Sequence, residues 1–221
     1  MQKIRDCPFP EDVLYDSDKN VWVKLDQDLA VVGIDVVLAW LSGPFTAVSF
    51  KEPGTVVERG KSLGSVEGPR HFDTVRAPLT GRIVAVNSSL KESPKLLNRE
   101  PYGEGWFVKM EPTRLEEEKG VLLGLESARG ALERKVTDFN VRCFAEYPDH
   151  EMFEIGSECA GILVKLDDLI ARSPPGVVVH LVSDDVTAEI ELNVWSERTH
   201  NELVEVRREG KLTHFIIRKS D

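Results

Sequence analysis

Between residues 18 and 112 the chain consists of short segments of alternating apolar and polar residues, separated by glycine and proline turns. A period of two is typical of strands that bury one face, and short strands joined by tight turns indicate an antiparallel sheet that folds back on itself. We therefore predict a small antiparallel sandwich or barrel, with short helices at 36–41 and 94–98. The expected strands cover 20–25, 45–50, 64–67, 74–77 and 81–87.

The composition changes near residue 113. Residues 114–135 are rich in Leu, Glu, Ala and Lys, which favours a helical connector. From 136 onward strands alternate with helices: 177–182 is a β-branched run, and a Ser-Pro-Pro-Gly sequence before it ends a helix. The order β-α-β-α-β-β predicts a two-layer α/β sandwich with both helices on one face of the sheet. We expect a two-domain α+β chain, with domains at 1–113 and 136–221.

The 221 residues carry a formal net charge of −10 at pH 7, and 41% of them are hydrophobic. This composition allows a sizeable core and argues against binding to nucleic acid or an anionic membrane, because both need a positive field. The N-terminus lacks the apolar stretch of a signal peptide, so we expect a cytoplasmic chain.

The three cysteines are widely spaced without a CxxC pair, which argues against a disulfide framework and a zinc site. The five histidines show no metal-ligand spacing, so no metal is expected.

Three motifs between residues 15 and 112 carry a family resemblance. They are Gly-Ile-Asp at 33–35, Ala-Pro-Leu-Thr-Gly at 77–81 and the hexapeptide Pro-Tyr-Gly-Glu-Gly-Trp at 101–106. With them, this part of the chain resembles the H-protein of the glycine cleavage system. The resemblance implies a barrel-sandwich hybrid fold, mainly β, in which a lysine on a hairpin carries lipoate.

Arg70 occupies the position of that lysine, in the hairpin Glu-Gly-Pro-Arg-His at 67–71. A guanidinium stays charged and non-nucleophilic, so it cannot form the amide bond to lipoic acid. We therefore expect no lipoate and no other cofactor, and Lys61 is a poor substitute because the attaching enzyme recognises a lysine at the tip of a rigid turn. Two interpretations of Arg70 and His71 stay open: a solvated turn in a scaffold that lost its role, or a basic tip that docks an anionic group or a partner protein.

From residue 156 to 219 the chain resembles the TusA/SirA sulfur-carrier family, through Cys159, Ser-Asp-Asp at 183–185 and the ending Phe-Ile-Ile-Arg-Lys at 215–219. The resemblance implies that Cys159 carries a persulfide. A thiol at a helix N-terminus also faces unpaired amides, which is expected to lower its pKa toward the reactive thiolate. Both prolines of the family motif are absent, and Glu158 opposes ionisation. The alternative is a partly buried cysteine without chemistry.

The sequence contains no GxSxG, Walker or GxGxxG motif, so we predict a carrier or adaptor rather than an enzyme, with a sulfurtransferase-like relay as the nearest activity. The preferred function is sulfur transfer by an unlipoylated H-protein-like/TusA-like fusion. Cys159 is its candidate persulfide carrier, and Arg70 and His71 are candidate docking residues for protein partners of the sulfur-transfer or lipoyl-carrier type. The alternatives are a non-catalytic protein–protein adaptor without thiol chemistry and a lipoyl carrier modified at an unusual lysine.

Overall fold

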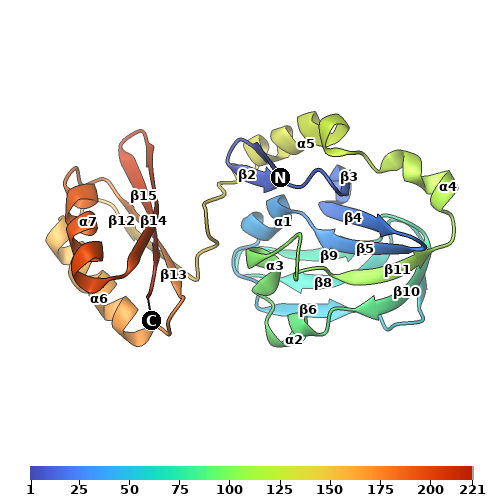
Figure 1. The fold of residues 1–221 in the computed structure, drawn as a ribbon, viewed down its shortest axis with the longest axis horizontal. Coiled ribbons are helices and arrows are strands. Elements are labelled where there is room, and N and C mark those ends of the chain that lie inside the picture. The colour runs from blue at the N-terminus through green and yellow to red at the C-terminus, as the bar shows by residue number, and fades with distance from the viewer. Residues whose placement is uncertain (221) are drawn as a thin grey trace. The chain divides into compact units, whose positions relative to one another are not determined.

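The computed structural model describes residues 1–220 and divides the chain into two compact units, unit 1 (Met1–Cys143) and unit 2 (Phe144–Asp221). Figure 1 shows that unit 1 is dominated by strands, whereas unit 2 combines one sheet with two long helices. Each unit has its own hydrophobic core.

Unit 1 contains two principal antiparallel sheets and a small N-terminal hairpin. The hairpin pairs β1 (Gln2–Ile4) with β2 (Cys7–Phe9). The larger sheet has six strands in the order β3 (Leu14–Asp16), β4 (Val21–Asp26), β5 (Leu29–Ile34), β11 (Val108–Pro112), β10 (Gly81–Val86) and β7 (Val56–Val57). The smaller sheet has three strands, β6 (Ala47–Phe50), β8 (Ser62–Glu67) and β9 (Phe72–Arg76).

The core of unit 1 lies between these two sheets. Val21 and Val32 from the larger sheet belong to the same fully buried cluster as Leu63 and Val66 from β8. Strands with one buried face are stable only when that face packs against another layer. The small antiparallel sandwich that the alternating pattern predicts is therefore confirmed.

Short helices close the ends of the sandwich: α1 (Val36–Leu41), α2 (Ser89–Glu92), α3 (Leu96–Arg99) and α4 (Leu115–Glu118), with 3₁₀ turns η1 (Ser17–Lys19) and η2 (Lys119–Val121). The helix expected at 36–41 is thus present at those residues. The one expected at 94–98 begins two residues later and ends one residue later.

The segment expected as a connector is part of unit 1. Helix α5 (Leu125–Asp138) buries Leu125, Ala128, Leu132 and Val136, one face of the helix, in a cluster with residues of β2, β3, β4 and α1. The compact unit therefore runs to Cys143 rather than ending at 113. A disulfide between Cys7 and Cys143, whose Cα atoms are 4.9 Å apart, joins the N-terminal hairpin to the last residue of the unit.

Unit 2 is a four-stranded sheet covered by two helices on one face. Its elements follow the chain as β12 (His150–Glu154), α6 (Cys159–Arg172), β13 (Val178–Ser183), α7 (Ala188–Thr199), β14 (Glu202–Glu209) and β15 (Leu212–Arg218). The strand order is β12-β13-β15-β14, with β12 and β13 parallel and the other pairs antiparallel. The core joins Ile162, Leu166, Leu192 and Trp195 of the helices to Val179, Leu181, Phe215 and Ile217 of the sheet.

Aspartates such as Asp184 and Asp185 are typical of a helix N-cap, but helix α7 begins later, at Ala188. The Oδ1 of Asp185 accepts the backbone N–H of Thr187 at 2.8 Å, so this carboxylate closes a turn before the helix instead of capping it. The first helical residue is Ala188, and the helix continues past Trp195 to Thr199.

Candidate functional site

Arg70 lies at the tip of the β8–β9 hairpin. Glu67 and Phe72 form the last cross-strand pair, and the N–H of Gly68 donates to the carbonyl of His71 at 2.9 Å, which closes a tight turn. Arg70 and His71 are both exposed. The sequence prediction of a hairpin tip at these residues therefore agrees with the geometry.

The tip is fixed against the end of α1. The N–H of Arg70 donates to the carbonyl of Ser42 at 3.3 Å. Gly68 approaches so closely that a Cβ there would lie 2.3 Å from the same carbonyl oxygen, and a Cβ on Gly43 would lie 3.0 Å from the ring of Pro69. Glycine at both positions is what lets the turn and the helix end pack together.

A buried amide holds the segment that supports the tip. The side chain of Asn98 donates to the carbonyls of Ala39 and Gly43, at 2.7 and 3.0 Å, and accepts the N–H of Phe45 at 2.9 Å. One side chain thus satisfies three backbone groups where α1 ends, which leaves this segment little freedom to move.

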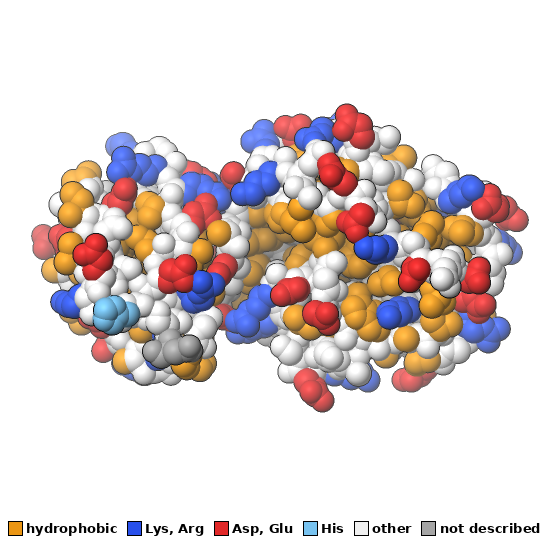
Figure 2. All heavy atoms as spheres, viewed as in Figure 1, with side chains coloured by type: hydrophobic (Ala, Val, Ile, Leu, Met, Phe, Trp, Pro, Cys, Tyr) orange, Lys and Arg blue, Asp and Glu red, His pale blue; other side chains and the backbone are white. Residues whose placement is uncertain are grey.

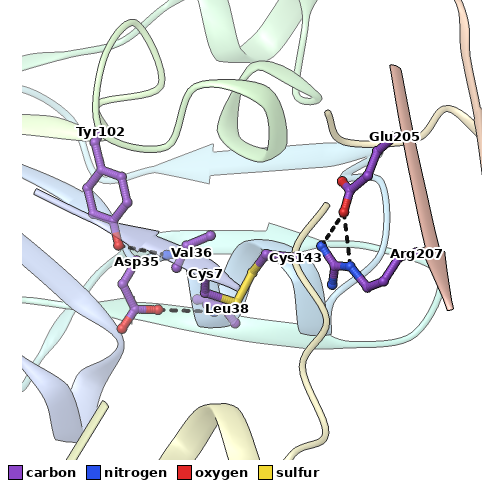
Figure 3. Close-up of a disulfide and its surroundings, with 8 residues drawn as sticks. All are labelled: Cys7, Asp35, Val36, Leu38, Tyr102, Cys143, Glu205 and Arg207. Atoms are coloured by element: carbon purple, nitrogen blue, oxygen red, sulfur yellow. Dashed lines mark hydrogen bonds and ion pairs between the residues drawn. A yellow bond between two sulfur atoms is a disulfide. The ribbon is translucent and has the colours of Figure 1, made fainter. Parts of the chain in front are cut away.

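The Gly-Ile-Asp motif and the Pro-Tyr-Gly-Glu-Gly-Trp hexapeptide meet at the other end of α1. Buried Asp35 caps the helix by accepting the N–H of Leu38 at 3.0 Å, and the hydroxyl of Tyr102 accepts the N–H of Val36 at 3.1 Å, as Figure 3 shows. Burial raises the pKa of Asp35 to about 6, against the lowering effect of the helix amides. Two of the three motifs that carry the family resemblance are therefore structural supports for α1 and, through it, for the hairpin.

The basic residues near the hairpin in sequence do not gather at its tip. Arg59 forms an ion pair with Asp16 at 3.3 Å, and Arg76 pairs across from Ser62 at the opposite end of the hairpin. Lys61 directly precedes β8, at that same opposite end. The positive charge of the tip comes from Arg70, with His71 beside Asp73 at 3.8 Å.

The residues at the tip do not fit a lipoyl group. The turn at 68–71 carries an arginine and no amine that could form the amide bond to lipoate, and Lys61 lies at the base of the hairpin rather than on its turn.

Cys159 is the first residue of α6, but its surroundings oppose thiolate formation. Only 2% of the residue is exposed, and its N–H donates to Oδ2 of Asp185 at 2.8 Å. Burial, a hydrogen bond to Glu191 and the negative charge of Asp185 raise the pKa of the Cys159 thiol to about 12. The expectation of a lowered pKa was wrong because desolvation and two carboxylates outweigh the helix amides.

Cys7 and Cys143 are also not as expected. Both are fully buried and bonded to each other, as the yellow bond in Figure 3 shows, although their number and spacing argued against a disulfide. Disulfides persist chiefly in oxidising compartments, so the pair gives no support to the cytoplasmic location, which stays a prediction.

Two negative observations apply to residues 1–220. No cluster of three or more His, Cys, Asp or Glu side chains there is arranged to hold a metal ion, and no helix there is long and apolar enough to cross a bilayer. Figure 2 shows positive and negative side chains intermingled over the visible face of both units.

The β-sandwich and its braced hairpin define unit 1 as a carrier domain of the lipoyl type. Residues 13–135 match the glycine cleavage H-protein family, and the chain belongs to that family. The matched residues end before unit 2 begins. The family consists of carrier proteins rather than enzymes.

Individual relatives are similar to this chain over most of their own length. Glycine cleavage system H protein 5 of Aquifex aeolicus is 35% identical over 147 residues, which span 65% of this chain and 99% of that protein. A probable glycine cleavage system H protein 2 of Sulfolobus acidocaldarius is 35% identical over 140 residues, 62% of this chain and 93% of its own length. The crystal structure of the glycine cleavage system H protein from Mycobacterium marinum superposes with a TM-score of 0.50 at 29% identity, over 55% of this chain and 97% of that one.

Proposed function

We propose that this chain is a non-lipoylated H-protein whose hairpin serves as a docking element, so that Arg70 and His71 contact a partner where other family members present a lipoyl arm. The supporting observation is the braced tip: Arg70 is exposed at a turn that is hydrogen-bonded both internally and to the end of α1. A drifting turn in a scaffold without a role would not need this support.

The chemistry of the tip indicates what it would recognise. A guanidinium binds carboxylate or phosphate groups in a bidentate manner, and a rigid backbone reduces the entropy lost on binding. Because H-proteins work with the partner proteins of the glycine cleavage system, an enzyme that accepts lipoyl carriers is the expected type of partner. The chain would then occupy the carrier's docking site without accepting its cargo.

A competition assay tests this function. Glycine cleavage activity is reconstituted with a lipoylated H-protein, and this chain is added in excess. We expect inhibition that the Arg70→Ala variant weakens about tenfold, as for an arginine that anchors an interface. Arg82→Ala, which removes an exposed arginine from β10 instead, is the matched control. Equal inhibition by the wild type and Arg70→Ala would contradict docking through the tip.

Sulfur transfer by a TusA-like unit 2 is the second candidate, supported by a free thiol on the first residue of α6. In this step the Cys159 thiolate attacks the outer sulfur of a donor persulfide, which yields a Cys159 persulfide and releases the donor as a thiolate. The step requires that Cys159 first become exposed, away from Asp185 and Glu191.

Intact-mass analysis after incubation with a low-molecular-weight persulfide tests this second function, with Cys159→Ser as the control. One added sulfur on the wild type and none on the variant supports it. An unmodified wild type beside a fully modified competent carrier would leave the docking function as the sole proposal for the chain. This outcome is independent of the competition assay, because Cys159 and Arg70 lie in different units.

A further inference from the structure

Two buried histidines form a hydrogen-bonded pair in unit 2, on the sheet face away from the helices. His180 of β13 and His214 of β15 are 6% and 4% exposed. Their rings stack with centroids 5.2 Å apart, and Nε2 of His180 lies 2.9 Å from Nδ1 of His214. Val179, Leu181 and Phe215, their neighbours in sequence, belong to the core beneath the helices, so alternation places both imidazoles on the opposite face.

A carboxylate faces each outer end of the pair. Nδ1 of His180 lies 3.7 Å from Glu151 on β12, and Nε2 of His214 lies 3.7 Å from Glu209 on β14. The four groups therefore form a row across all four strands of the sheet, in the order carboxylate, imidazole, imidazole, carboxylate.

Proton counting shows which state this row favours. Two neutral imidazoles share two protons, and the central hydrogen bond uses one of them. Whichever ring donates it, one outer nitrogen is then bare and faces a carboxylate. A third proton gives each outer nitrogen an N–H toward its carboxylate and keeps the central bond. A fourth proton would place an N–H on both nitrogens of the central contact. These nitrogens lie 2.9 Å apart, and neither could then accept a hydrogen bond.

Phe144, the first residue of unit 2, packs against the histidine pair. The ring of Phe144 is 4.5 Å from the His180 ring and 5.5 Å from the His214 ring. The next residue, Ala145, donates its N–H to Glu205 of β14 at 2.7 Å. A positive charge on the imidazoles would be attracted to the electron-rich ring of Phe144.

Other charged groups near the pair are engaged with partners. Arg207 lies over the ring of Phe144, 4.4 Å from its centroid, and forms an ion pair with Glu205 that Figure 3 shows. In the segment that follows Phe144, Glu146 pairs with Arg218, and Asp149 accepts the N–H of Val178 at 3.0 Å. Glu151 and Glu209 each lie 3.7 Å from an outer imidazole nitrogen of the pair.

We propose that the His180–His214 pair binds one shared proton and acts as a proton-operated latch, which holds the Phe144–Ala145 segment on the sheet when protonated and loosens it when neutral. The latch is independent of the proposed docking function. Because the three-proton state keeps the central hydrogen bond and gives each outer nitrogen an N–H toward its carboxylate, the latch is expected to hold at mildly acidic pH and to loosen as pH rises.

Nitrogen NMR of the full chain labelled on its histidine rings tests the proton count directly. We expect the pair to carry three ring N–H groups at about pH 6 and two at about pH 8. A pair that keeps two ring N–H groups over this whole range would overturn the proposal, and so would one that gains a fourth within it.

Hydrogen exchange of the Ala145 amide tests the latch. In the wild type its protection factor is expected to fall about tenfold between about pH 6 and about pH 8. Glu151→Gln and Glu209→Gln, which keep the side-chain shape but remove the charge, should each reduce this change, and His214→Phe should abolish it. His150→Gln alters an exposed histidine on β12 and serves as the control. An unchanged pH dependence in both glutamine variants contradicts the latch even if His214→Phe does not fold.

Discussion

In unit 1 the exposed candidate residue is unreactive, and in unit 2 the reactive candidate residue is buried. At the hairpin of unit 1, Arg70 is exposed on a braced turn, but it offers no nucleophile. At the start of α6 in unit 2, Cys159 offers a nucleophile, but it is buried, and carboxylates oppose its ionisation. A carrier needs an atom that is both reactive and exposed, so neither site is a complete carrier site in this conformation. The hairpin presents an exposed and braced contact surface, whereas the thiol of unit 2 is buried, which is why docking is the better supported function.

The largest effect expected concerns the reactivity of Cys159. A pKa raised from 9.0 to about 12 reduces the thiolate fraction at neutral pH on the order of 10³-fold. Alkylation by iodoacetamide, followed by mass spectrometry, should therefore be slower by about that factor in the folded chain than in urea. Cys159→Ser supplies the blank. Similar alkylation rates in the folded and unfolded chains would show that folding does not suppress the reactivity of Cys159, which contradicts the difference drawn between the two units.

Breaking the disulfide should weaken unit 1 and leave unit 2 unaffected. The bond closes a loop with a sequence separation of 136, and loss of a native disulfide typically costs 2–5 kcal/mol. The Cys7→Ala/Cys143→Ala double variant should lose about that much unfolding free energy in unit 1. Hydrogen exchange can assign the loss to one unit. Equal destabilisation of both units would show that their stabilities are not separate.

Asp35 should make the stability of unit 1 depend on pH. Its pKa rises from 3.8 to about 6 on folding, so the stabilisation is present below about pH 4 and is lost as pH rises through about 6, by roughly 3 kcal/mol. Asp35→Asn keeps an acceptor for the N–H of Leu38 and removes this loss. Urea unfolding should show the variant gaining relative to the wild type by roughly that amount between pH 4 and pH 7. A pH-independent difference would contradict the assignment.

The smallest expected changes in stability distinguish a residue that supports the hairpin tip from the exposed residue at the tip. Gly68→Ala places a Cβ against the carbonyl of Ser42 and should cost about 2 kcal/mol of unfolding free energy. Arg70→Ala removes an exposed side chain and should change stability by less than about 0.5 kcal/mol. Thermal unfolding of the two variants measures both. A larger loss from Arg70→Ala than from Gly68→Ala would mean that Arg70 is a structural residue.

Local patterns anticipated much of unit 1, because its strands, turns and first helix are encoded by residues near one another. The hairpin tip and α1 lie where alternation and turn residues place them. Helix α5 was misassigned as a connector even though Ala128, Leu132 and Val136 recur on one helical face, because the pattern does not reveal what that face packs against.

Features that depend on distant residues were missed. Three cysteines do not specify a pairing, and Cys7 meets Cys143 only after α5 folds back onto the N-terminal hairpin. The pKa of Cys159 is raised by burial and then by Glu191, which α7 supplies from another part of the sequence. His180 and His214 gave no spacing signal, although they occupy neighbouring positions once β13 and β15 pair.

Lipoylation of Arg70→Lys most directly tests whether the hairpin retains a carrier's geometry without its attachment atom. The wild type and the variant are each incubated with a lipoate-attaching enzyme, lipoate and ATP, and their intact masses are measured. We expect one lipoyl group on the variant and none on the wild type. A lipoyl group on the wild type would place the arm on another lysine and contradict the account, and an unmodified variant would show that the hairpin has lost the carrier geometry.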